Sequence, residues 1–128
     1  MELILHHYDF SNYAEKVRLA LGYKGLAWRG VTIPPVAPKP DLTPLTGGYR
    51  RTPVLQVGAD IFCDTRLILR ELERRKPQPS LDPDGTAALA DMISYWAEHH
   101  STLKSSNVPI RPADLWSCPN AGIVTVPV

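Results

Sequence analysis

Cysteine is nearly absent from this 128-residue chain, which contains only Cys63 and Cys118. Two cysteines so far apart form neither a disulfide framework nor the ligand spacing of a zinc site. The paired histidines do not supply a metal site either, because neighbouring side chains of a strand, such as His6 and His7, point to opposite faces. We therefore expect a protein of a reducing compartment, the cytoplasm, with no bound metal.

Charge and hydrophobic length are also limited. The formal net charge is +1 and the pI is about 7.8, so nothing suggests nucleic acid or an anionic membrane as a partner. No apolar run approaches the roughly 20 residues of a membrane span. The start of the chain has Glu2 and no basic segment, unlike a signal peptide. The composition, with 44% apolar residues, predicts a soluble protein with a hydrophobic core.

Proline, in contrast, is abundant. The 13 prolines form about a tenth of the chain, twice the usual share of about 5%, and they cluster between segments of regular pattern. Apolar spacing predicts strands at residues 3–5, 26–33, 54–57 and 61–63, and helices at residues 12–24, 64–76 and 86–104. Gly25 should end the first helix, and residues 34–51 and 105–128 are expected to be irregular.

The order β-α-β-β-β-α predicts an α/β fold of the thioredoxin-like type, a mixed sheet with helices on its faces. This domain should occupy residues 1–77, followed by a linker at residues 78–85. The helix at residues 86–104 has a wide apolar stripe, which must pack against another element. The stripe consists of Leu89, Met92, Ile93, Trp96, His100 and Leu103.

The most informative segment begins at Ser11, shortly after the first strand. A strand that ends in a polar turn and enters a helix presents the unpaired N–H groups of the first helical turn, and these favour anions. A hydroxyl at Ser11 can donate a hydrogen bond to a thiolate there. Such a bond lowers the pKa of a thiol from its ordinary value of about 8.5. Alternatively, Ser11 serves only as the N-cap of the helix.

Three local patterns together resemble the N-terminal domain of the cytosolic glutathione S-transferases. Residues 11–21 are similar to the segment around the catalytic serine of the serine-type classes. Residues 52–55, Thr-Pro-Val-Leu, are similar to the family's Val-Pro-x-Leu, whose proline is cis. Asp64 and Thr65 stand where the family has Glu-Ser. The resemblance covers about residues 1–76, and the helix from Thr86 resembles the start of the family's all-helical second domain, truncated here.

The resemblance implies how the thiol of glutathione would be activated. Ser11 would donate a hydrogen bond to the thiolate. Tyr8 is the alternative activator, because other classes use a tyrosine at the end of the first strand. Glutaredoxins carry Cys-x-x-Cys where this chain has Ser11 and Ala14, so disulfide exchange through that motif is excluded. Asn12 replaces the family's usual proline and leaves the hydroxyl in place.

The resemblance also implies how glutathione would be bound. A cis Thr52–Pro53 bond would let the Thr52 backbone pair with the cysteinyl amide, as in a strand. Asp64 would offer its carboxylate to the γ-glutamyl ammonium, and Thr65 its backbone N–H and hydroxyl to the γ-glutamyl carboxylate. Arg51 or the adjacent Arg50 would meet the glycyl carboxylate, although a solvated basic loop is an equal alternative.

The resemblance leaves two functions open. The first is a glutathione S-transferase, with glutathione as co-substrate, a small electrophile as second substrate and a homodimer as a further expectation. The second is a non-catalytic module of the same fold that binds glutathione or a partner protein. The missing helices of the second domain motivate this alternative.

Overall fold

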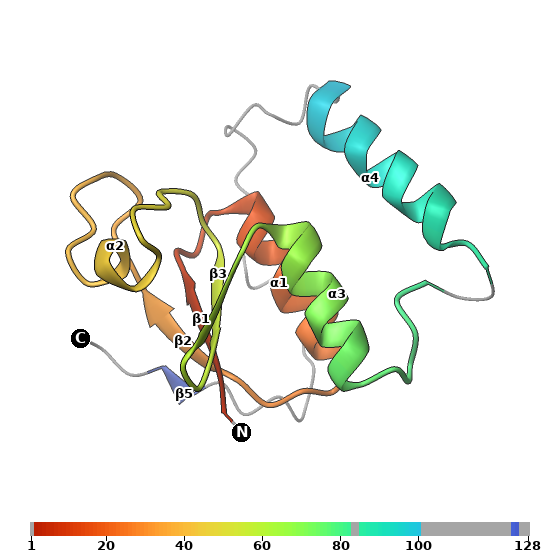
Figure 1. Cartoon of the computed structure of the whole chain (residues 1–128), viewed down its shortest axis with the longest axis horizontal. Coiled ribbons are helices and arrows are strands. Elements are labelled where there is room, and N and C mark those ends of the chain that lie inside the picture. Colours follow the sequence, from red (N-terminus) through yellow and green to blue (C-terminus); the bar gives the residue numbers. More distant parts are fainter. Residues whose placement is uncertain (1, 83–84, 101–123, 126–128) are drawn as a thin grey trace. The chain divides into compact units, whose positions relative to one another are not determined.

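A five-stranded mixed sheet in the order β4-β3-β1-β2-β5 organises the fold (Figure 1). The computed structural model describes residues 2–82, 85–100 and 124–125. β1 pairs in parallel with β2 and antiparallel with β3, and β3 pairs antiparallel with β4. This arrangement confirms the predicted thioredoxin-like order. The strands are β1 (Leu3–His7), β2 (Arg29–Thr32), β3 (Val54–Val57), β4 (Asp60–Cys63) and β5 (Val124–Thr125).

The helix α1 (Asn12–Tyr23) ends two residues before Gly25, the glycine predicted from the sequence to end it. Gly25 has a φ of +56°, which a glycine adopts without steric cost. The amide of Gly25 donates to the carbonyl of Gly22 at 2.9 Å, and the amide of Leu26 donates to the carbonyl of Leu21 at 3.0 Å. These two bonds form a Schellman motif, which closes the helix and turns the chain toward β2.

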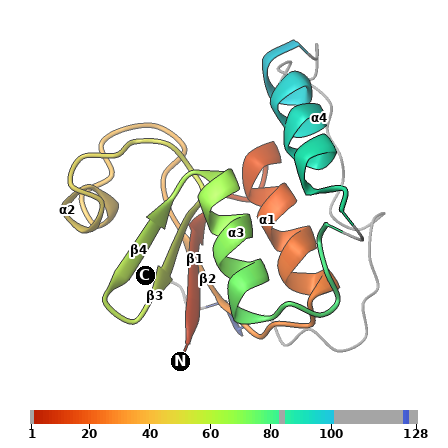
Figure 2. The same ribbon diagram turned by 45° about the vertical axis from the view of Figure 1, so that its right-hand side comes forward.

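The helices α1 and α3 (Thr65–Arg75) lie side by side against one face of the sheet (Figure 2). Leu5 of β1 and Leu55 of β3 stand directly opposite each other and are fully buried. Together with the buried residues of the two helices they form the larger core. The helical contributors are Ala14, Val17, Ala20 and Leu21 of α1, and Ile68 and Leu72 of α3.

A smaller core involves α2 (Leu42–Leu45), a short helix within residues 34–51, which were expected to be irregular. Leu42 is 1% exposed and clusters with Ile33 and Val54. In Figure 2, α2 lies across the strands from α1 and α3. The prediction missed α2 because a single turn is too short to show helical spacing.

The described residues belong to two units, which are Met1–Pro79 with Pro119–Val128, and Ser80–Cys118. In the second unit, α4 (Ala87–His100) forms within the predicted helix at residues 86–104. The members of the predicted stripe with described side chains are exposed, namely Leu89, Met92, Ile93 and Trp96. Leu103 lies outside the described residues. Within the described ranges, no helix has both the length and the apolarity needed to cross a membrane.

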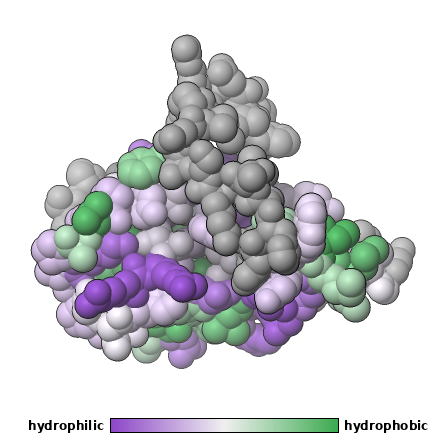
Figure 3. All heavy atoms as spheres, turned by 90° about the horizontal axis from the view of Figure 1, so that it is seen from above, coloured by the Kyte–Doolittle hydropathy of each residue, from purple (hydrophilic) through white to green (hydrophobic). Residues whose placement is uncertain are grey.

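On the face seen in Figure 3, the hydrophobic side chains of the described residues form green patches among purple, hydrophilic residues. Scattered apolar side chains of this kind are normal on protein surfaces.

The strand β5 differs from the expectation for residues 105–128, which were predicted to be irregular. It pairs in parallel with β2, with Val124 opposite Arg29 and Thr125 opposite Gly30. Two residues are too few to show the alternation that identifies a strand in sequence. Of this segment, only Val124 and Thr125 are among the described residues.

Candidate functional site

The predicted site residues come from three segments that meet at one edge of the sheet. His6 near the end of β1 stands opposite Val54 at the start of β3, and Val54 stands opposite Cys63 at the end of β4. The segment after β1, the segment before β3 and the segment after β4 therefore emerge at the same edge (Figure 2). These segments carry, respectively, Tyr8 and Ser11, Thr52 and Pro53, and Asp64 and Thr65.

Ser11 caps α1 and is almost completely buried, with 5% of its surface exposed. Its Oγ accepts a hydrogen bond from the amide of Ala14 at 3.2 Å, which confirms the expected N-cap. Its own amide donates to the carbonyl of Tyr8 at 3.2 Å, which fixes the loop before the helix. A hydroxyl has one proton and two lone pairs, so capping leaves the proton of Ser11 for a second partner. Capping and donation to a thiolate are therefore compatible.

The Thr52–Pro53 peptide bond is cis, as the family resemblance implied. The hydroxyl of Thr52 accepts a hydrogen bond from Lys39 Nζ at 3.1 Å, and the same ammonium donates to the carbonyl of Arg50 at 3.2 Å. Burial lowers the pKa of Lys39, which is only 9% exposed. Lys39 therefore joins the proline-rich loop to residues 50–52, the segment that precedes β3.

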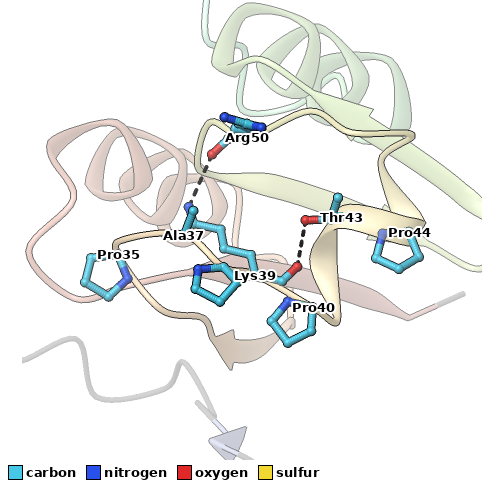
Figure 4. A pocket seen from close by; sticks show the side chains of 8 residues that line it. Pro35, Ala37, Lys39, Pro40, Thr43, Pro44 and Arg50 are labelled. Carbon is cyan, nitrogen blue, oxygen red and sulfur yellow. Dashed lines mark hydrogen bonds between the residues drawn. The ribbon is translucent and has the colours of Figure 1, made fainter.

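Lys39 is a residue that sequence reasoning missed. It lies in a run of prolines, where no periodicity marks any position as buried. With Arg50 it lines a pocket of about 590 Å³, shown in Figure 4, where Thr43 Oγ1 donates to the carbonyl of Lys39 at 2.7 Å. The lining of the pocket combines an apolar surface, made mostly by prolines, with the two basic residues Lys39 and Arg50. Its lining consists of Pro35, Ala37, Pro38, Lys39, Pro40, Thr43, Pro44 and Arg50.

Asp64 has an unusual backbone conformation, with φ at +79° and ψ at +132°. Its Oδ1 accepts from the amide of Arg66 at 2.9 Å, so Asp64 is the N-cap of α3. A positive φ is strained for a side chain other than glycine, and such strain gathers at functional positions. The side chain of Asp64 is exposed, whereas Thr65 is buried at the first position of the helix.

The ionisable groups around Asp64 change the pKa of Tyr49. Burial, and then the charges of Asp64 and Cys63, raise the pKa of Tyr49, while Arg51 lowers it. Arg51 itself is exposed. Burial raises the pKa of the Cys63 thiol, which makes this thiol a poor nucleophile. Among the described residues, no three His, Cys, Asp or Glu side chains are placed to hold a metal ion together.

Tyr8 lies on the same side of the sheet as α2. Its ring packs against the small core formed with Leu42, and its centroid is 4.8 Å from that of Phe10. Lys39 Nζ lies 5.8 Å from the centroid of the Tyr8 ring. Tyr8 is therefore held by packing against its neighbours, whereas Ser11 stands at the N-terminus of α1.

Comparisons with known proteins agree on the family. Residues 5–80 match the model of the glutathione S-transferase N-terminal domain. A GST-like protein from Pseudomonas syringae is 52% identical, and its structure superposes with a TM-score of 0.75 over 88% of this chain and 42% of that one. No curated protein matches the chain.

Two further solved structures show the range of relatives. A rice glutathione S-transferase in complex with glutathione is 27% identical, with a TM-score of 0.64 over 76% of this chain and 45% of that one. Maleylacetoacetate isomerase from Anaeromyxobacter dehalogenans is 30% identical, with a TM-score of 0.54 over 75% and 42%. The chain thus spans less than half the length of these structures. Through its N-terminal domain, the chain belongs to the glutathione S-transferase family.

Proposed function

We propose that this chain binds glutathione at the sheet edge between Ser11, Thr52 and Asp64 and activates its thiol. The observation that carries the proposal is the convergence of these residues, which follows from the register of β1, β3 and β4. Relatives of the same fold have been solved with glutathione bound, which supports the choice of ligand.

Each end of glutathione has a candidate partner of suitable chemistry. The exposed carboxylate of Asp64 would pair with the γ-glutamyl ammonium, and Thr65 at the start of α3 would offer its N–H to the adjacent carboxylate. The Thr52 backbone, before Pro53, would pair with the cysteinyl amide. Arg51 is exposed and is proposed to meet the glycyl carboxylate.

The thiol would lie at the N-terminus of α1. There the Ser11 O–H and the helix dipole both stabilise a thiolate, because hydrogen bonds and positive potential favour the charged form. The thiol proton leaves to solvent. The sulfur then attacks an electrophilic carbon, and a carbon–sulfur bond forms as the leaving group departs with its electron pair. A small electrophile would be the second substrate of this reaction. The enzyme would be a cytoplasmic homodimer that acts in detoxification.

A second candidate is glutathione binding without conjugation. The relatives include an isomerase as well as transferases, so the shared domain does not by itself specify conjugation. The chain also spans less than half of the length of these relatives. Under this alternative, the same residues bind glutathione, but no electrophile is consumed.

The decisive test is a calorimetric titration with glutathione of the wild-type chain and of Asp64→Asn. Asparagine keeps an oxygen that can cap α3 and tolerates positive φ, but it lacks the charge that the ammonium requires. We expect an affinity loss of about tenfold, because charge-assisted hydrogen bonds are roughly twice as strong as neutral ones. Asp60→Asn is the matched control, since Asp60 lies at the opposite end of β4.

The outcomes separate the possibilities. Binding that weakens in Asp64→Asn but not in Asp60→Asn supports the site. Binding that is unaffected by Asp64→Asn places glutathione elsewhere, and no binding to the folded wild-type chain rejects the proposal. An assay with a chromogenic electrophile then distinguishes conjugation from binding alone.

A further inference from the structure

Arg18 connects α1 to the loop that carries both candidate thiol activators. Its Nη1 lies 3.0 Å from Nδ1 of His7, and its Nη2 donates to the carbonyl of Asp9 at 2.9 Å. These two contacts involve the residues on either side of Tyr8, and Asp9 lies two positions before Ser11. The guanidinium also pairs with Glu15, through a hydrogen bond from Nε at 2.8 Å. One side chain therefore fixes the path of residues 7–9.

The contact with His7 requires a neutral imidazole. Arginine has only donors, so Nδ1 of His7 must accept and the ring proton must reside on Nε2. His7 is 7% exposed, and its ring meets that of Trp28 edge-on, with centroids 5.7 Å apart. Gly30 leaves room for it, since a Cβ there would lie 2.9 Å from Nε2. The imidazole is thus enclosed by Arg18, Trp28 and Gly30.

Protonation of His7 would replace the attraction between its ring and Arg18 by repulsion. A proton on Nδ1 would face the guanidinium of Arg18, and two cationic donors cannot share a hydrogen bond. Burial and the charge of Arg18 lower the pKa of His7, whereas Asp9, Glu15 and the Tyr8 backbone oppose that shift. The neutral form therefore prevails at neutral pH, and acid converts the ring to the form that rejects Arg18.

We propose that His7 and Arg18 form a pH-dependent latch, which positions the loop of Tyr8 and Ser11 while His7 is neutral and releases it when His7 is protonated. Arg18 is a positioning residue here, since it acts on glutathione only through the loop. The consequence for glutathione rests on the proposed function, whereas the movement of the loop does not.

The latch has a defined direction in pH. His7 has a lowered pKa in the folded chain, so its contribution to stability is complete above the ordinary histidine value of about 6.5 and is lost as the pH falls through the lower folded value. Free carboxyl groups ordinarily titrate near 4 and thiols near 8.5. Between pH 5 and 7.5, two groups of the complex therefore change charge, His7 and the bound thiol, whose pKa the proposed site lowers. A substitution of His7 removes only the first of them.

The first measurement follows the latch without any ligand. In a chain labelled with ¹⁵N, the imidazole nitrogen signals of His7, assigned by their loss in His7→Asn, should show an unprotonated Nδ1 at pH 7.5. As the pH falls, the backbone amides of Asp9, Phe10 and Ser11 should shift with the same midpoint as His7. A different ring tautomer, or loop amides that ignore the His7 titration, would overturn the latch.

The second measurement uses glutathione affinity at pH 5 and pH 7.5. We expect the wild-type affinity to fall about tenfold at pH 5, the loss that one charge-assisted hydrogen bond would produce. Asparagine at position 7 places Oδ1 where histidine has Nδ1, so His7→Asn keeps the acceptor for Arg18 and cannot titrate. This variant should lose less affinity at pH 5 than the wild type does, because only the bound thiol still titrates. Arg18→Gln should bind weakly at both.

The matched control is His6→Asn, because His6 points to the opposite face of β1 and pairs with Gln56 at 3.0 Å. It should keep the wild-type pH dependence. A pH dependence that is reduced in His6→Asn, or that is as large in His7→Asn as in the wild type, contradicts the latch. Failure of the wild-type chain to bind glutathione at either pH rejects the proposed function alone, because the loop amides still decide the latch.

Discussion

The ammonium of Lys24 is completely buried and lies 2.5 Å from the carboxylate of Glu73. It also donates to the carbonyl oxygens of Lys76 at 2.7 Å and Pro79 at 3.0 Å. An ammonium has three donors, and these three oxygens match them. Lys24 caps the end of α1, and Glu73 belongs to α3, so one side chain joins the C-terminal ends of the two helices.

Lys24→Met should destabilise the chain by about 3 kcal/mol. Methionine fills much of the volume but leaves a carboxylate and two carbonyl groups without their donor, and removal of one partner from a buried ion pair typically costs this much. Urea denaturation measures the change. The control is Lys16→Met on the same helix, where the lysine is partly exposed and the cost should be smaller. Equal effects of the two substitutions would contradict the role of Lys24.

Gly30→Ala should destabilise the chain by roughly 1–3 kcal/mol, as overpacking usually does. The new Cβ would lie 2.9 Å from His7 Nε2 and 3.3 Å from Trp28 Cζ3, so the enclosed imidazole must move. The matched control is Gly22→Ala, within α1, where a Cβ meets nothing within 4 Å. That substitution should stabilise by about 0.5–1 kcal/mol, because alanine is the better helix former. Thermal unfolding of both variants tests the contrast in sign.

The sequence allowed prediction of those features that depend on local pattern. The cap at Ser11 and the glycine that follows α1 each depend on a few neighbouring residues with known conformational preferences. The positive φ of Asp64 could not be foreseen, because aspartate only rarely adopts it.

Other features depend on contacts between distant residues. Lys39 is buried because the loop folds back on Thr52, and His7 meets Arg18 because α1 crosses the face of β1. Neither contact leaves a periodic signal in the sequence. The strand β5 was not predicted for the same reason, since its two residues form a strand only through their pairing with β2.

Glu71 should make the stability of the chain sensitive to acid. Hydrogen bonds from Arg74 above all, and then from Arg75, lower the pKa of Glu71 from 4.5 to about 2, against the opposing effect of burial. A lowered carboxyl pKa contributes stability that is complete above about 4.5 and is lost as the pH falls toward 2. Glu71→Gln should therefore cost about 1.5 kcal/mol at pH 7, the value of a hydrogen bond to a charged group, and less at pH 3.

Urea midpoints between pH 2.5 and 7 measure this dependence. The control is Glu2→Gln, because Glu2 pairs with Arg29 at 2.6 Å on an exposed surface, where such pairs contribute little. If Glu71→Gln shows the wild-type acid dependence, another group is responsible for it.

Ser11 and Tyr8 can be separated as thiol activators by the pKa of bound glutathione. Ser11→Ala removes the O–H donor and should raise the thiol pKa by about one to two units toward its free value. Tyr8→Phe removes a hydroxyl from a ring that packs against the α2 side of the sheet, and should leave the thiol pKa unchanged. Thiolate absorbance in the ultraviolet, titrated against pH at saturating protein, gives both values.

The loss of the cap must be distinguished from the loss of the donor. Ser11→Ala should also cost about 1 kcal/mol of stability, because the amide of Ala14 loses its acceptor. Ser11→Thr keeps a hydroxyl that both caps and donates, so it should retain the low thiol pKa. A raised thiol pKa in Tyr8→Phe, with a normal value in Ser11→Ala, would assign activation to Tyr8. Ser11 would then be only the residue that begins α1.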